Sequence, residues 1–148
     1  MESLLISACL LGENCKYNGG SNALPAELLE RLRQRYVLVP VCPERLGGLP
    51  TPRVPSERRG ERVVSRDGKD VTEAFRRGAE LALATAKDRG CRKALLKERS
   101  PSCGCAGIYD GSFQNRLIPG LGVTAQLLQD AGIEVCGESK ADELAWEK

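Results

Sequence analysis

The sequence predicts a single α/β domain: a Rossmann-like three-layer fold with a mainly parallel sheet of about four strands and a small β-hairpin excursion. Three observations support this prediction. Short apolar runs alternate with amphipathic helical segments, which is the pattern of βαβ units. The length of 148 residues suits one domain, and no linker or internal repeat divides it. Hydrophobic residues make up 41% and charged residues 28%, as in a globular protein. We therefore expect one domain over residues 1–148.

The first half of the chain predicts one strand–helix–strand unit. Residues 4–11 form an apolar run with the length of a buried strand, which Gly12 ends. Residues 24–35 place leucines at helical spacing, and Pro25 suits an early helical position. Residues 36–42 are rich in β-branched side chains and predict a second buried strand. The order strand, helix, strand favours parallel pairing of the two strands.

The second half continues this alternation after an irregular segment. Residues 44–60 are rich in proline and glycine, and irregular stretches of this length are usually functional or disordered. Residues 62–65 predict a minor hairpin strand. The remaining elements are expected in this order: a helix from Asp70 or Thr72 to about Arg89, a third strand at residues 93–98, a turn or hairpin at residues 108–113, a helix opened by Gly120 and Gly122 that runs through Gln129, and a fourth strand at residues 133–136.

Charge balance and residue types exclude several classes of function. Lys and Arg total 22 and Asp and Glu total 20, so the net charge of +2 gives no electrostatic footprint for nucleic acid or an anionic membrane. The chain contains no histidine, which excludes Ser-His-Asp and Cys-His triads and imidazole metal ligands. The arginines of residues 53–66 are interspersed with carboxylates and lack aromatic neighbours, so we expect a solvated face. Among them, Arg53 lies between two prolines and is expected to point at a ligand.

No targeting or membrane-spanning segment is expected. The N-terminus is acidic and its apolar run is short, whereas a secretory signal needs a basic flank and a longer apolar stretch. No stretch approaches the ~20 apolar residues of a membrane span. We therefore predict a cytoplasmic protein, in which thiols stay reduced and a group of cysteines indicates metal binding or catalysis.

Seven cysteines carry the main functional signal. Cys9, Cys42 and Cys103 each lie at or just past the C-terminal end of a predicted parallel strand, and open α/β sheets bind ligands beyond those ends. Three thiolates gathered there would leave one coordination position open, and soft sulfur ligands select zinc, copper(I) or iron–sulfur clusters. The alternative is that a cysteine acts as a small buried hydrophobic residue, which we expect for Cys91 and Cys136.

Polar residues and glycines lie beside these cysteines. Glu44 follows the second of them by two residues and could act as general acid or base where no histidine is present. Ser100 and Ser102 could hydrogen-bond a substrate, although loop serines more often form turns. Gly120 and Gly122 precede a helix whose N–H groups could face an anion or a carbonyl oxygen. They lack the full dinucleotide fingerprint, so we do not expect a nicotinamide cofactor.

A series of motifs runs through almost the whole chain. It includes residues 7–12 (Ser-Ala-Cys-Leu-Leu-Gly), 15–19 (Cys-Lys-Tyr-Asn-Gly), 42–44 (Cys-Pro-Glu), 47–53 (Gly-Gly-Leu-Pro-Thr-Pro-Arg), 100–104 (Ser-Pro-Ser-Cys-Gly) and 120–124 (Gly-Leu-Gly-Val-Thr). In their order these motifs resemble the thiouracil desulfurase family, formerly described as a domain of unknown function. Lys16 and Asn18 stand where arginine and aspartate are common in that family.

The resemblance implies an activity, a cofactor and a set of site residues. It implies a [4Fe–4S] cluster held by Cys9, Cys42 and Cys103, with the fourth iron free of protein ligands. Glu44 and Ser100 would be the catalytic residues. The implied reaction removes sulfur from a small-molecule thiolated nucleobase such as 2-thiouracil, giving the oxo base and hydrosulfide. The residues expected to contact this substrate are Arg53, Ser102, Gly120 and Gly122.

Three alternatives stay open at this point. A related enzyme on the same scaffold would desulfurate a thionucleoside derived from tRNA. A non-catalytic iron–sulfur or zinc sensor would have its metal fully ligated, with Cys15 or Cys105 as the fourth thiolate. A thiol redox protein is disfavoured because the chain contains no Cys-x-x-Cys. The sequence also leaves open whether the protein is a monomer or a homodimer.

Overall fold

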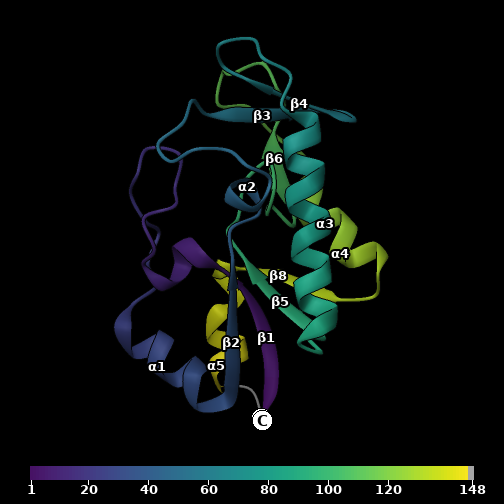
Figure 1. The fold of residues 1–148 in the computed structure, drawn as a ribbon. Helices are drawn as coiled ribbons and strands as arrows, with labels where there is room; N and C mark the ends of the chain where they lie inside the picture. The colour runs from purple at the N-terminus through teal and green to yellow at the C-terminus, as the bar shows by residue number, and fades with distance from the viewer. Residues whose placement is uncertain (147–148) are drawn as a thin grey trace.

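A four-stranded parallel sheet forms the centre of the protein. The computed structural model describes residues 1–146, and its central sheet has the strand order β2–β1–β5–β8 (Figure 1). The strands are β1 (Glu2–Ser7), β2 (Tyr36–Val41), β5 (Lys93–Leu96) and β8 (Glu134–Gly137). Neighbouring strands run parallel in every pair of this sheet. The predicted α/β fold with a mainly parallel sheet is therefore confirmed.

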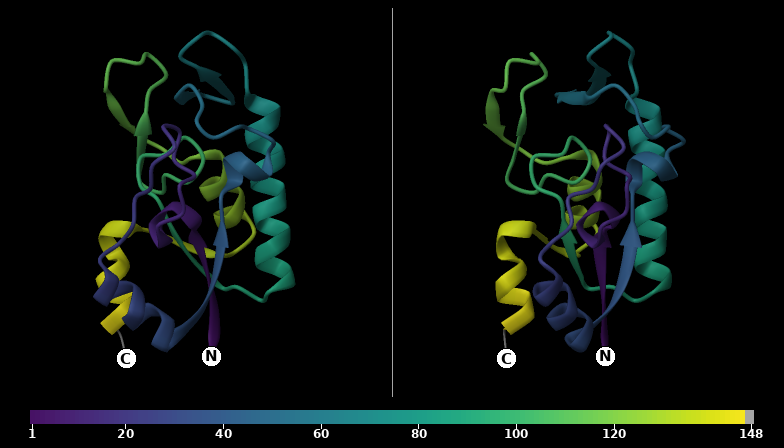
Figure 2. Two further views of the ribbon diagram at one scale, coloured as in Figure 1. Left: turned by 60° about the vertical axis from the view of Figure 1, so that its left-hand side comes forward. Right: turned by 90° about the vertical axis from the view of Figure 1, so that its left-hand side faces the viewer.

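Two helical layers cover the two faces of the sheet (Figure 2). One face carries α1 (Ala26–Arg35) and α5 (Ala141–Trp146), and the other carries α3 (Thr72–Asp88) and α4 (Val123–Asp130). Side chains alternate between the faces along a strand. In β1, Leu4 therefore packs in the cluster that contains Leu32 of α1, whereas Leu5 packs in the cluster that contains Ala82 of α3. The helices α1, α3 and α4 confirm the three helices that the sequence predicts. No helix within residues 1–146 is long and apolar enough to cross a membrane.

The order of the strands places a crevice between β1 and β5. The chain passes from β1 through α1 to β2 on one side, and then through α3 to β5 on the other side of β1. The connections after β1 and β5 therefore leave the sheet in opposite directions. In open α/β sheets, ligands bind at this point, outside the carboxyl ends of the strands.

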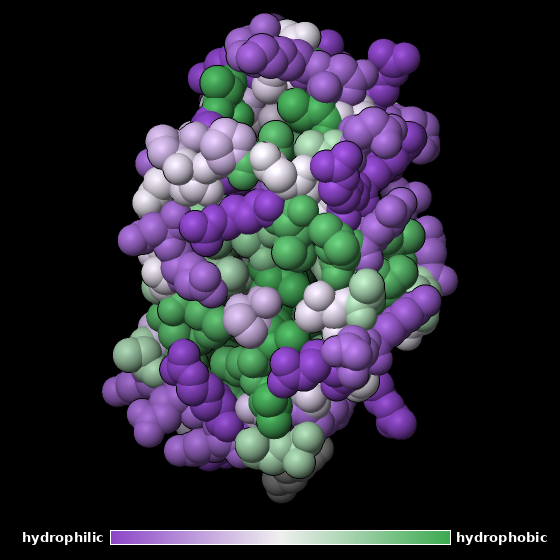
Figure 3. Space-filling model, in the orientation of Figure 1, coloured by the Kyte–Doolittle hydropathy of each residue, from purple (hydrophilic) through white to green (hydrophobic). Residues whose placement is uncertain are grey.

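β2 is an edge strand, which explains how it can contain a proline. Pro40 cannot donate a hydrogen bond to a neighbouring strand, so proline is confined to sheet edges. Pro40 pairs in register with Ile6 on one side, and no strand within residues 1–146 lies on its other side. Figure 3 shows hydrophobic residues gathered over β2 in the middle of this face, with hydrophilic residues around them. Val37 of β2 is 39% exposed.

The first strand is shorter than the sequence predicts. The apolar run at residues 4–11 predicts one strand, but β1 ends at Ser7 and Ala8–Leu11 forms a 3₁₀ helix, η1. The pairing of β1 with β2 ends at Ser7, and its pairing with β5 ends one residue earlier. Beyond this point no strand offers partners, so the chain turns and the N–H of Gly12 donates to the carbonyl of Cys9 at 3.2 Å. Gly12 has a φ of +98°, which glycine adopts without strain.

Two antiparallel hairpins lie outside the central sheet. The predicted hairpin strand at residues 62–65 is confirmed as β4 (Arg62–Ser65), and it pairs with β3 (Ser56–Arg59) inside the segment predicted to be irregular. β6 (Gly107–Tyr109) pairs with β7 (Leu117–Pro119) where the sequence predicts a turn or hairpin. Two further elements, η2 (Glu138–Lys140) and α5, are not among those that the sequence predicts.

A close contact between two glycines fixes the short helix α2 (Pro43–Leu46) against α3. A Cβ atom on Gly78 of α3 would lie 1.8 Å from a carbonyl oxygen of α2, and a Cβ atom on Gly47 would lie 1.9 Å from a carbonyl oxygen of α3. The two backbones therefore meet directly, and a side chain at either position would push them apart. Because α2 begins after Cys42 and carries Glu44 in its first turn, this contact sets the position of both residues.

Candidate functional site

One cavity of about 600 Å³ lies at the carboxyl edge of the central sheet. The segments that follow β1, β2 and β5 form one side of it, and residues of the two hairpins form the other. The cavity therefore occupies the crevice between β1 and β5, where the order of the strands predicts a ligand site.

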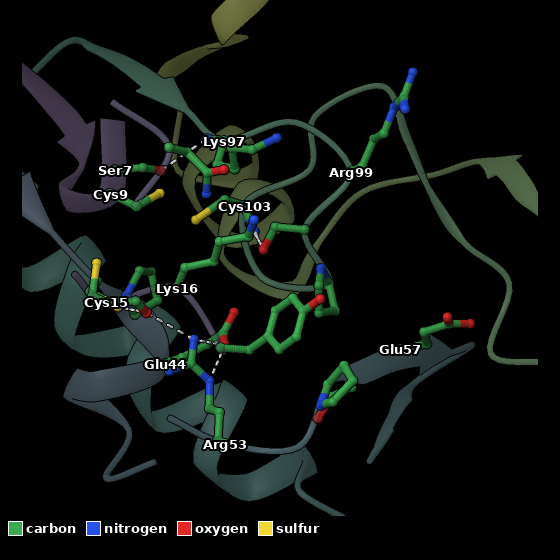
Figure 4. Close-up of a pocket in the computed structure, with 18 of the residues that line it drawn as sticks. Ser7, Cys9, Cys15, Lys16, Glu44, Arg53, Glu57, Lys97, Arg99 and Cys103 are labelled. Atoms are coloured by element: carbon green, nitrogen blue, oxygen red, sulfur yellow. Dashed lines mark hydrogen bonds and ion pairs between the residues drawn. The ribbon is translucent and has the colours of Figure 1, made fainter. Parts of the chain in front are cut away.

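The three predicted ligands, Cys9, Cys42 and Cys103, all line this cavity. Cys42 directly follows β2, Cys9 lies in η1 two residues past β1, and Cys103 lies in the turn after β5. Figure 4 shows the sulfur atoms of Cys9 and Cys103 pointing toward one another. Burial, with smaller contributions from Glu44, Cys9 and Cys42, raises the pKa of the Cys103 thiol to about 12. The three cysteines therefore surround one cavity.

Cys15 is a further thiol at this site, whereas Cys105 is not. Cys15 lines the cavity and is 2% exposed. Its carbonyl oxygen lies 4.0 Å from the sulfur of Cys42, and burial together with Cys42 raises the pKa of the Cys15 thiol to about 12. Cys105 lies outside the cavity and packs against the hydrophobic cluster that contains Cys91. Cys136 packs against the hydrophobic cluster on the other face of the sheet.

The donor set has the chemistry of an iron–sulfur site, because soft thiolate ligands select zinc, copper(I) or iron–sulfur clusters. Thiolates around one zinc ion each lie about 2.3 Å from it and must crowd together. An iron–sulfur cluster is held through cysteine thiolates bound to separate iron atoms, so its ligands stand further apart around a shared space. Cys9, Cys42 and Cys103 around one cavity agree with this second arrangement.

Polar neighbours support two of these sulfur atoms. Burial raises the pKa of Cys9 and of Cys103, and hydrogen bonds from the side chains of Asn22 and Ser7, respectively, partly oppose the rise. The Ser7 hydroxyl oxygen also accepts the backbone N–H of Lys97 at 2.9 Å, and the positive charge of Lys97 lowers the pKa of Cys9. No sequence pattern indicates these roles of Asn22, Ser7 and Lys97, because the contacts join segments that are far apart in the chain.

Glu44 lines the cavity from the first turn of α2 and forms a buried ion pair with Arg53. Their side chains are 16% and 9% exposed. Nε of Arg53 donates to Oε2 of Glu44 at 2.7 Å, and Nη2 contacts the same oxygen (Figure 4). Burial raises the pKa of Glu44, and the charge and hydrogen bond of Arg53 oppose this rise. Arg53, for which the sequence predicts a contact with substrate, thus lines the cavity and contacts the Glu44 carboxylate.

Ser100 lies at the start of the turn that carries Cys103. Its hydroxyl oxygen accepts the backbone N–H of Ser102 at 3.1 Å and that of Cys103 at 3.0 Å. These bonds define the turn, and they place Ser100 on the cavity wall next to Cys103. The hydroxyl proton remains available to a ligand, because both bonds use only the lone pairs of the oxygen.

Ser102, Gly120 and Gly122 lie behind the cavity wall and do not line the cavity. Ser102 is fully buried, and its hydroxyl shares a hydrogen bond of 2.7 Å with that of Thr124. A Cβ atom on Gly122 would lie 2.4 Å from the carbonyl group of Ser102, so glycine allows α4 to approach the turn. The first N–H groups of α4 donate to carbonyl groups of the same turn at 2.8 and 2.9 Å and are not free for a substrate. Ser102 and Gly122 thus support the turn of Cys103 from behind, whereas Gly120 packs against Ile108.

The two hairpins supply the far wall of the cavity. Arg66 stacks over Phe113 at 5.6 Å from the centre of the ring, and Tyr109 also lines this wall. Glu57 accepts the backbone N–H groups of Gly111 at 3.0 Å and of Phe113 at 3.1 Å. This carboxylate therefore holds the loop between β6 and β7 in place. No spacing in the sequence indicates these contacts, because they join two separate hairpins.

Comparisons with known proteins agree with the motifs. A family model described as 2-thiouracil desulfurase matches residues 4–140. A solved structure, described as the [4Fe-4S]-dependent thiouracil desulfidase TudS, superposes with a TM-score of 0.93 at 48% identity, covering 98% of this chain and 96% of that chain. An uncharacterized protein of Bacillus subtilis (strain 168), YbbK, is 40% identical over 151 residues, covering 95% of this chain and 99% of its own length.

Proposed function

Because this chain belongs to the 2-thiouracil desulfurase family, we propose that it removes the sulfur of a thiolated pyrimidine of the 2-thiouracil type. It is an iron–sulfur enzyme of the class that cleaves C–S bonds. The proposed products are the oxo base and hydrosulfide. The proposed cofactor is a [4Fe–4S] cluster that Cys9, Cys42 and Cys103 hold, with one iron open to substrate. The observation that supports this proposal is that these sulfurs, Glu44 and Ser100 line one cavity.

The reaction replaces sulfur by oxygen at one carbon of the pyrimidine ring. A C–O bond forms from water, the C–S bond breaks, and the sulfur leaves as hydrosulfide, so no net electron transfer is needed. When bound, the cluster would supply a soft Lewis-acidic iron for the substrate sulfur. Glu44 would take a proton from the attacking water, and the Ser100 hydroxyl would hold or protonate the ring.

Glu44 is suited to the role of base for two physical reasons. The chain has no histidine, the most common general base, and a carboxylate is among the side chains that can take that role. Burial raises the pKa of Glu44 and makes its carboxylate more basic than one in water, while Arg53 favours the charged form. The cavity therefore contains a poorly solvated carboxyl group that is paired with Arg53.

The proposal includes the compartment and the partners of the enzyme. All the cysteines of the chain are free thiols in the structure, as in a reducing cytoplasm, where we propose that the enzyme acts. Its partner is a small thiolated nucleobase, and neither a membrane nor a nucleic acid is required. Assaying 2-thiouracil beside its nucleoside would define the substrate class. Size-exclusion chromatography with light scattering would separate a monomer from a homodimer.

The test of this function uses enzyme purified and loaded with its cluster under anaerobic conditions. We expect the wild-type protein to convert 2-thiouracil to uracil and to release hydrosulfide. Glu44→Gln should keep the absorption of the cluster and lose at least about 100-fold in kcat, because general base catalysis contributes that much. Glu13→Gln is the matched control, since Glu13 has a half-exposed side chain and lies outside the cavity.

Two results would contradict this proposal. If the wild-type enzyme holds a cluster but leaves both 2-thiouracil and its nucleoside unchanged, the proposed reaction is refuted. If the Glu44→Gln variant has the kcat of the wild type, the reaction stands but Glu44 is not its base.

A further inference from the structure

We propose that Arg53 is a positioning residue: it fixes the Glu44 carboxylate through one oxygen and leaves the other oxygen to act on the substrate. This inference rests on the proposed role of Glu44 as base. It replaces the contact between Arg53 and substrate that the sequence predicts.

The contacts of the carboxylate are divided unequally between its two oxygens. Both Nε and Nη2 of Arg53 contact Oε2 of Glu44. Among the described residues, no hydrogen bond reaches Oε1, and no side-chain oxygen in the structure is both fully buried and unpaired. Oε1 is therefore not fully buried, and Glu44 is one of the residues that line the cavity. One oxygen is held by Arg53, and the other has no partner among the described residues.

Arg53 has no donor left for a substrate. A guanidinium group carries five N–H donors. Nε and one N–H of Nη2 are directed at Glu44. Nη1 donates to the carbonyl of Pro50 and to the hydroxyl of Thr51, both at 3.2 Å. The second N–H of Nη2 donates to the carbonyl of Cys15 at 3.2 Å. To donate to a ligand, the side chain would have to give up one of these contacts. Its planar group is therefore committed to holding Glu44.

These contacts also fix the direction of the carboxylate relative to the sulfur atoms. Arg53 joins the backbone around Cys15, which lies beside Cys42, to the side chain at the start of α2. The backbone N–H of Arg53 donates to the carbonyl of Tyr17 at 2.6 Å, so the residue is held at both ends. These contacts thus hold Glu44 in one orientation in the cavity. Rigid placement of a base matters because a shift of about 1 Å can lower the reaction rate about 100-fold.

The experiment compares Arg53→Gln and Arg53→Lys in the cluster-loaded enzyme, with Arg58→Gln as control. Arg58 is on the neighbouring strand β3, also donates to backbone carbonyls, and does not line the cavity. We expect Arg53→Gln to lower kcat by about 100-fold and to leave KM and the binding of uracil close to the wild-type values. Arg53→Lys should recover part of kcat, because an ammonium keeps the charge but not the two-point contact. Cluster absorption and melting temperature verify that each variant is folded.

A double variant separates positioning from a general structural role. If Arg53 acts through Glu44, the variant with Arg53→Gln and Glu44→Gln should be no slower than Glu44→Gln alone. An additive loss, or a parallel fall of cluster content and activity, would show that Arg53 only ties loops together. A rise in KM with an unchanged kcat would show that it binds substrate. Any of these three results in an active wild-type enzyme overturns this inference alone. An inactive wild-type enzyme overturns the proposed function.

Discussion

Replacing Gly78 by alanine tests whether the contact between α2 and α3 sets the geometry of the site. The new Cβ atom would lie 1.8 Å from the carbonyl oxygen of Pro43, and real Cβ atoms do not approach such an atom more closely than 3.0 Å. The carbonyl belongs to the backbone and cannot swing away, so α2 must move by more than about 1 Å. Glu44 lies in the same turn and moves with it, and a shift of about 1 Å can cost about 100-fold in rate.

The effect of Gly78→Ala on stability combines two opposite contributions. Alanine is favoured over glycine inside a helix by about 1 kcal/mol. Overpacking a close contact costs about 1–3 kcal/mol, and a clash with backbone belongs at the upper end of that range. We expect a net loss of about 2 kcal/mol, which for a domain of this length lowers Tm by about 4–8 °C.

The assay for Gly78→Ala measures Tm by calorimetry and kcat with 2-thiouracil on the same preparation. Arg77→Ala is the control, because this neighbour on α3 is exposed and is also changed to alanine. The reasoning is refuted if Gly78→Ala melts above the wild type, as helix propensity alone would predict, and turns over at the wild-type rate.

Two further predictions concern the ligands and the start of α3. Cys103→Ser should lose most of its iron during anaerobic gel filtration, whereas Cys105→Ser should keep it, because Cys103 lines the cavity and Cys105 does not; equal losses from both would assign Cys105 to the cluster. Hydrogen bonds from Thr72 hold the pKa of Asp70 below its ordinary value of 3.8, so the stabilisation by the ionised group is complete above that pH and is lost as the pH falls through the lower folded-state value. The difference in Tm between the wild type and Asp70→Asn should therefore be largest near neutral pH and shrink below about pH 4, and a difference that grows in acid would contradict this assignment.

The central elements of the fold could be predicted because each has a strong local pattern. The apolar runs at β2 and β5 and the helical spacing of α1 and α3 depend on residues that are neighbours in sequence. The end of β1 could not be predicted in this way, because η1 buries the same apolar side chains that a strand would. Its boundary depends on where the neighbouring strands stop, which local sequence does not contain.

The site shows the same division between local and distant information. Cys9, Cys42 and Cys103 could be predicted to meet, because the carboxyl ends of parallel strands lie at one edge of a sheet. The direction of Arg53 could not, because it depends on acceptors from three separate segments. Ser102 could not be placed either, since its burial depends on Gly122 bringing α4 against the turn.

Quantifying iron and acid-labile sulfide in protein purified without oxygen tests the central claim most directly. The claim is that sulfur atoms from three strand ends hold one iron–sulfur cluster in this cavity. We predict a brown protein with iron and sulfide in equal amounts, close to one [4Fe–4S] cluster per chain. A colourless protein with a single tightly bound zinc ion would contradict the account.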